Sequence, residues 1–98
     1  MSRDAVQVAP DVYKVLLEND KVRILEINTD PGASSEMHSH PNMALYAVTD
    51  CTWKLKSEDG EEIVAEIPAG GVFYQDATSH AATDVGKAGS RAIAIEIK

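Results

Sequence analysis

The sequence predicts an all-β protein: an antiparallel sandwich or barrel of about nine or ten short strands with little or no helix. Short runs rich in β-branched and aromatic residues recur roughly every 8–12 residues, the spacing typical of such folds. Glycines and prolines lie between the runs and mark turns. The chain has 98 residues and is 44% hydrophobic, so we expect one compact domain over 1–98.

The expected strands follow from the apolar runs in chain order. A weak run at 6–8 comes first, and helical periodicity competes only over Val12, Val15 and Leu16, where β-branched content and short length favour a strand. Ile63 and Ala65 alternate with their neighbours and fall on one face of a strand. The full set of expected strands is 6–8, 12–17, 22–28, 37–40, 45–48, 52–56, 62–67, 72–75, 80–84 and 92–97.

Composition excludes several classes of function. The formal net charge is −7, which disfavours nucleic acid as a partner because phosphate backbones are repelled. No run approaches the roughly 20 apolar residues of a membrane span, and the first residues lack the apolar stretch of a signal peptide. The single cysteine, Cys51, leaves no intrachain disulfide, and we expect a cytoplasmic protein.

Histidines carry the clearest chemical signal. His38 and His40 are two residues apart, so in a strand both would point to the same face and could converge on one ion. Pro41 favours an extended His40. The other interpretation is a pair of surface histidines on a strand. His80 joins the pair only if the fold brings it back across 40 residues.

The motifs around these histidines resemble those of a small cupin. Gly32 precedes His38-Ser39-His40 by five intervening residues, and Pro68-Ala69-Gly70 precedes His80 by nine. The resemblance covers about residues 12–97 and implies a jelly roll of two antiparallel sheets. The run 12–26 is similar to a subgroup of cytoplasmic cupins labelled β-alanine degradation proteins.

The chain departs from the usual motif at one ligand. The glutamate that commonly completes the metal site would fall at Ala44 or Leu45, neither of which can bind a metal. The resemblance therefore implies a Glu-less site of His38, His40 and His80, similar to cupin dioxygenases that act on thiols and diketones. We expect one divalent ion, iron, zinc or nickel, since histidine ligands do not distinguish these metals.

Three neutral imidazoles leave a divalent ion with its full charge and with open coordination positions. This favours a small anionic molecule as ligand, and dioxygenase-like chemistry is the preferred reaction, ahead of isomerase or hydrolase chemistry. The alternative is a non-catalytic module that binds or senses a small molecule through the metal. Because imidazoles bind metal only when neutral, affinity should fall below about pH 6.5.

Four further residues are candidates for the surroundings of the site. Glu36 shares the alternation of the histidines and is either a ligand, a support for an imidazole or a solvated side chain near a turn. The others, Tyr46, Tyr74 and Gln75, either line the pocket or pack in the interior. Trp53 is expected in the core or at a subunit contact. Many small cupins pair, so the resemblance also implies a homodimer. In such a dimer we expect the segment 5–17 to lie across the partner.

Overall fold

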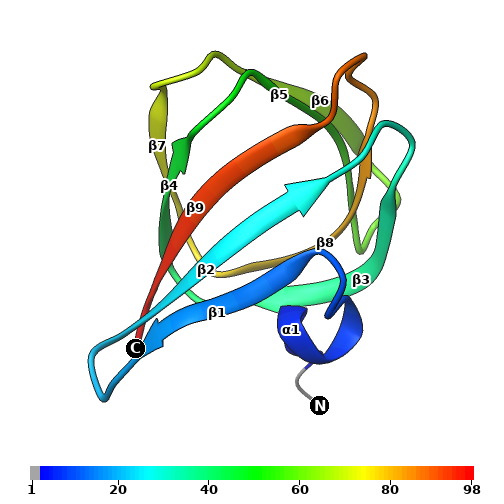
Figure 1. Ribbon diagram of the computed structural model, residues 1–98. Helices are drawn as coiled ribbons and strands as arrows, with labels where there is room; N and C mark the ends of the chain where they lie inside the picture. The colour runs from blue at the N-terminus through cyan, green and yellow to red at the C-terminus, as the bar shows by residue number, and fades with distance from the viewer. Residues whose placement is uncertain (1–2) are drawn as a thin grey trace.

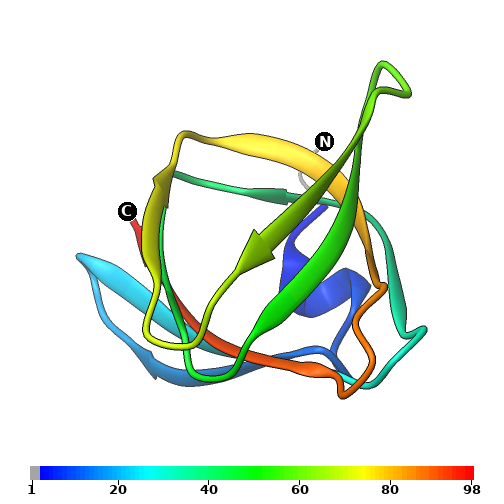
Figure 2. The ribbon, with the colours of Figure 1, turned by 90° about the horizontal axis from the view of Figure 1, so that it is seen from above.

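The computed structural model describes residues 3–98 and contains two antiparallel sheets that face one another (Figure 1). One sheet has five strands in the order β1-β2-β9-β4-β7, and the other has four in the order β3-β8-β5-β6. Seen from above, the strands curve around a common interior (Figure 2). The predicted all-β double-sheet fold is therefore confirmed.

The nine strands are short and almost all follow the predicted apolar runs. Their bounds are β1 (Tyr13–Glu18), β2 (Val22–Thr29), β3 (Ser34–His40), β4 (Met43–Ala47), β5 (Cys51–Ser57), β6 (Glu62–Ile67), β7 (Val72–Gln75), β8 (Thr78–Asp84) and β9 (Ser90–Ile97). The run with competing helical periodicity is strand β1, as predicted.

The weak strand expected at 6–8 was wrong, because this segment is a single helical turn, α1 (Ala5–Val8). The Asp4 carboxylate caps the turn by accepting a hydrogen bond from the Val6 amide. Ala5 is fully buried and the turn packs against β3 and β1. Tertiary packing thus decides a conformation that three residues of β propensity cannot specify.

The core lies between the sheets and is built from the inward-facing residues of both. In β9 burial alternates strictly, so that Ala92, Ala94 and Glu96 face inward. The two alanines are fully buried, as is Leu25 on the neighbouring strand β2. Trp53 lies in this core, in agreement with one of its two predicted positions.

Strand β3 contains an irregularity that determines which of its side chains face the core. Ser35 pairs with Ala82 and His38 pairs with His80, so β3 has one residue more than β8 over this stretch. Such a bulge shifts the alternation of the strand. Ser35, His38 and His40 are buried as a result, whereas the side chain of Glu36 is exposed.

No helix within residues 3–98 combines the length and the apolar character needed to cross a membrane.

Candidate metal centre

The three histidines meet in the interior, on two neighbouring strands of the four-stranded sheet. His38 and His80 face each other directly across the β3–β8 ladder, and His40 follows on the same face of β3. All three are buried, and one ring nitrogen from each lies within 4.8 Å of the other two. The fold therefore brings His80 next to His38 and His40, an association that spacing along the sequence could not predict.

Hydrogen bonds fix the tautomers of two of these rings. His38 Nδ1 donates to the carbonyl oxygen of Glu36 at 2.8 Å, so Nε2 is the unprotonated nitrogen that carries the lone pair. His40 Nδ1 donates to the carboxylate Oε2 of Glu96, also at 2.8 Å, so its Nε2 is likewise the ligating atom. A ring that is held through one nitrogen presents the other to a metal in a fixed direction.

Glu36 contributes its backbone rather than its side chain. The bulge in β3 turns the carboxylate to solvent and breaks the shared alternation that the sequence suggested. The solvated side chain, one of the three predicted alternatives, is what the structure contains. Its carbonyl nevertheless holds His38.

Burial favours the neutral form of two of these rings, His38 and His80. Loss of hydration, together with the neighbouring imidazoles of His38 and His40, lowers the pKa of His80 to about 3. Burial also lowers the pKa of His38, with the Glu36 carbonyl opposing the shift. Neutral imidazoles at ordinary pH are the form that binds a metal. At His38 and His80, proton competition should thus begin below the pH of 6.5 expected from free histidine.

Glu96 is a buried carboxylate that sequence reasoning missed. Its Oε1 accepts a hydrogen bond from Arg23 Nε at 2.7 Å, and Arg23 forms a second ion pair with Asp4 at 2.6 Å. The signal was present in the sequence, because the alternation of β9 places Glu96 on the same inward face as two alanines. A lone buried carboxylate requires a partner, and here the partners are Arg23 and His40.

Tyr13 was also missed as a neighbour of the site. Its hydroxyl donates to His38 Nε2 at 2.9 Å, and its ring contacts both His38 and His40 edge-on. Burial raises the pKa of Tyr13, so the group is a neutral phenol. The hydroxyl must release His38 Nε2 before that nitrogen can bind a metal. No pattern in the sequence distinguished this tyrosine from an ordinary core residue.

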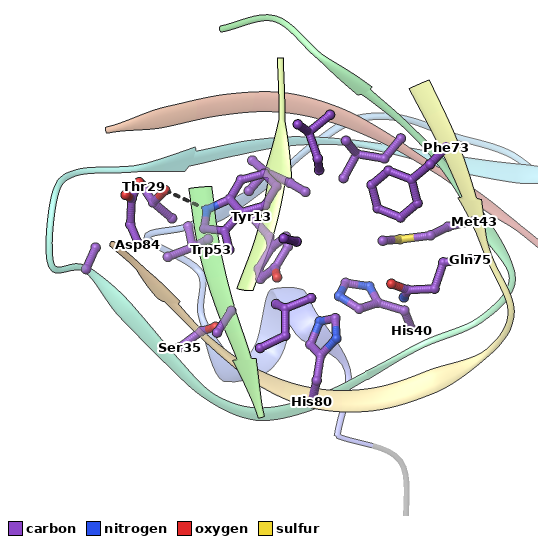
Figure 3. A pocket seen from close by; sticks show the side chains of 18 residues that line it. Tyr13, Thr29, Ser35, His40, Met43, Trp53, Phe73, Gln75, His80 and Asp84 are labelled. Atoms are coloured by element: carbon purple, nitrogen blue, oxygen red, sulfur yellow. Dashed lines mark hydrogen bonds between the residues drawn. The ribbon is translucent and has the colours of Figure 1, made fainter. Parts of the chain in front are cut away.

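A mainly apolar cavity of about 40 Å3 adjoins the histidines (Figure 3). His40 and His80 lie at one end, and Trp53, Thr29 and Asp84 lie at the other. One water molecule needs roughly 10–15 Å3 of such volume, so the cavity has room for only a few atoms of a ligand. Of the predicted lining residues only Gln75 lines it, since Tyr46 and Tyr74 are exposed on the outer surface.

Comparisons with known proteins support the fold. No family model matches the chain, and no curated protein matches its sequence. Among solved structures, a cupin domain from Bordetella pertussis Tohama I is similar over 100% of this chain and 97% of its own, with a TM-score of 0.81 and 18% identity.

Two further structures show the same likeness. A cupin superfamily protein from Desulfitobacterium hafniense DCB-2 has a TM-score of 0.65 and 14% identity, covering 88% of this chain and 75% of its own. A conserved protein with a double-stranded β-helix domain from Klebsiella pneumoniae has a TM-score of 0.68 and 18% identity, covering 88% and 70%. The chain therefore has the fold of cupin domains, as its two histidine motifs predicted.

Proposed function

We propose that this chain is a metal-dependent cupin that binds one divalent ion through His38, His40 and His80 and acts on a small anionic metabolite. One observation carries the proposal: three buried imidazoles from separate positions converge within 4.8 Å, and two of them are already oriented through their second nitrogen.

The donor set fits a divalent transition metal. Imidazole nitrogens suit iron, zinc and nickel, and three of them leave coordination positions open for a ligand. An ion bound there would supply Lewis acidity and, if it were iron, the capacity for oxygen chemistry. We propose dioxygenase-like chemistry as the leading reaction, in the cytoplasm.

The chain's own residues prepare this site in two ways. Glu96 holds His40 and places a negative charge behind it, which strengthens the imidazole as a ligand. The apolar walls of the cavity, among them Met43, Leu45 and Phe73, limit the water around the histidines. Electrostatic attraction between an ion and an anionic ligand is stronger in such surroundings than in water.

A non-catalytic module that binds or senses a small molecule is the second candidate function. The size of the cavity favours it, because about 40 Å3 leaves little room for two reactants beside a metal. Tight binding of a ligand without turnover would distinguish this function from an oxygenase.

The first experiment measures the metal content of the untagged protein by elemental mass spectrometry. We expect close to one equivalent in the native chain and none in a His38→Ala/His80→Ala double variant. Glu36→Gln is the matched control, because this side chain belongs to the same strand but is exposed, and the variant should retain the metal.

The reaction is tested by oxygen uptake of the iron-loaded protein with panels of carboxylates, diketones and thiols. Uptake above background with one class would support the oxygenase. A native chain that binds no iron, zinc or nickel after loading would contradict the proposed function as a whole.

A further inference from the structure

Most polar groups around the cavity have partners within the protein. Trp53 Nε1 donates to Thr29 Oγ1 at 3.0 Å, and Thr29 Oγ1 donates in turn to Asp84 Oδ2 at 2.6 Å. Tyr13 and His40 are hydrogen-bonded to His38 and Glu96 respectively. The polar groups at the Trp53 end of the cavity therefore already have hydrogen-bond partners and do not need a ligand to supply one.

Gln75 is the exception within residues 3–98. Its amide nitrogen is buried and has no hydrogen-bond partner, the one such side-chain atom in the described part of the chain. Leaving a buried amide unpaired is unfavourable, so a group in this state calls for an explanation. Figure 3 shows the amide end directed toward the ring of His40.

Gln75 is held in this position by the sheet. It is the last residue of β7 and pairs with Met43 of β4, while the next turn is fixed by a hydrogen bond from the Ala77 amide to Asn42 Oδ1. The unpaired donor thus lies at the same end of the cavity as His40 and His80. The Gln75 amide and the three histidines therefore together determine where the polar part of a ligand lies.

We propose that Gln75 is the specificity-determining residue of the site, and that its amide donates to one carboxylate oxygen of a short aliphatic monocarboxylate bound at the three histidines. The inference rests on the proposed function and narrows its anionic ligand. A carboxylate has a second oxygen for the ion, and its short aliphatic part suits apolar walls. A thiolate would gain less from the Gln75 amide than a carboxylate does, because sulfur is the weaker hydrogen-bond acceptor.

A hollow beside the histidine end of the cavity argues against a second carboxylate. Leu55, Gln75 and His80 line both the cavity and this hollow on the outer surface, so the two adjoin one another. Two acidic side chains, Glu61 and Asp76, line that hollow. A dicarboxylate would have to place its second charge against these groups or in the apolar cavity, both of which are unfavourable.

The test uses zinc-loaded protein and three probes: propionate, succinate and propane-1-thiol. Succinate is propionate with a second carboxylate, and the thiol lacks oxygen acceptors. Binding is followed by NMR titration and by the emission of Trp53, the sole tryptophan, which lines the cavity. The variants are Gln75→Leu and, as a linear substitute, Gln75→Met. Gln7→Leu is the matched control, because Gln7 is exposed on α1.

We expect wild-type protein to bind propionate more tightly than succinate. The Gln75→Leu substitution should lower the affinity for propionate by about tenfold or more. Binding of zinc and of the thiol should be unchanged. Metal-free Gln75→Leu should also melt higher, by about 4 °C or more, because the unpaired donor is gone. Gln7→Leu should behave as wild type in every assay.

Equal propionate affinity in wild type and both Gln75 variants, within roughly twofold, would overturn this inference and leave the metal site intact. The inference would also be overturned if wild-type protein bound zinc but not propionate, or if it preferred succinate to propionate. Failure to bind zinc at all would instead remove the proposed function on which the inference depends.

Discussion

At the scale of single residues, the site depends on groups that hold the histidines as much as on the histidines themselves. His40 is oriented by a carboxylate from the opposite sheet, and His38 by a backbone carbonyl of its own strand. Both contacts engage Nδ1, so the two rings offer the same atom, Nε2, to an ion. Such orienting partners contribute to metal affinity without touching the metal.

Replacing Glu96 by glutamine should lower zinc affinity by about 10- to 100-fold, because His40 loses the charge behind it. Competition with a chelator of known affinity measures the effect. Glu66→Gln on the exposed face of β6 is the matched control and should bind as wild type does. Unchanged affinity in a folded Glu96→Gln protein would show that the carboxylate serves only the ion pair with Arg23.

At the scale of elements, turns and a bulge decide which side chains meet. The bulge in β3 rotates Ser35 and His38 onto the same inward face, although they are three residues apart. The turn before β9 is equally constrained. Gly89 there has a φ of 81°, and a Cβ at this position would lie 2.7 Å from the carbonyl oxygen of Thr29.

Gly89→Ala should therefore destabilise the protein more than Gly60→Ala does. Both glycines have positive φ, but nothing lies within 4 Å of a Cβ at Gly60. We expect about 1 kcal/mol from backbone strain at Gly60 and about 1–3 kcal/mol more from the clash at Gly89. Urea denaturation of the two variants measures the difference, and equal losses would contradict a tightly packed turn around Thr29.

At the scale of the whole molecule, burial of His38 and His80 makes stability depend on pH. The pKa of His80 is about 3 in the folded protein and near 6.5 in the unfolded chain. Between these values the unfolded chain binds more protons, so stability is complete above about pH 6.5 and falls as the pH drops toward 3. His38 adds to the loss, because its pKa is lowered in the same direction.

Metal-free protein should accordingly lose up to about 1.4 kcal/mol of stability per pH unit from His80 within this window. Urea denaturation at a series of pH values checks the slope. His80→Gln removes one titrating group and should flatten the curve. A His80→Gln protein with the slope of wild type would show that other groups carry the acid sensitivity.

The homodimer implied by the cupin resemblance stays a prediction. Strand β1 is an edge of the five-stranded sheet, and Val15, Leu16 and Leu17 on it are exposed. An exposed apolar edge strand is a surface for pairing with another chain. Light scattering should give twice the 10.6 kDa of one chain, and Leu16→Lys should halve that mass. A wild-type mass of a single chain would refute the dimer.

The amino-acid sequence by itself determined the fold class and indicated which three histidines would form the cluster. Alternation within strands and glycine or proline turns are local features, and they predicted the strands β1–β9 closely. The two motifs, with His38 and His40 in one and His80 in the other, indicated a cupin through their order and spacing along the chain. The local pattern was wrong at α1, where it predicted a strand and the burial of Ala5 favours a helical turn.

Only the tertiary structure decided what surrounds the histidines. The placement of His38 opposite His80 depends on the register of two strands far apart in sequence, and the bulge that turns Glu36 outward depends on the same register. Tyr13 and Glu96 reach the site from the other sheet. Alternation specifies the face on which a side chain lies, but its neighbours across the core depend on long-range pairing that no local pattern contains.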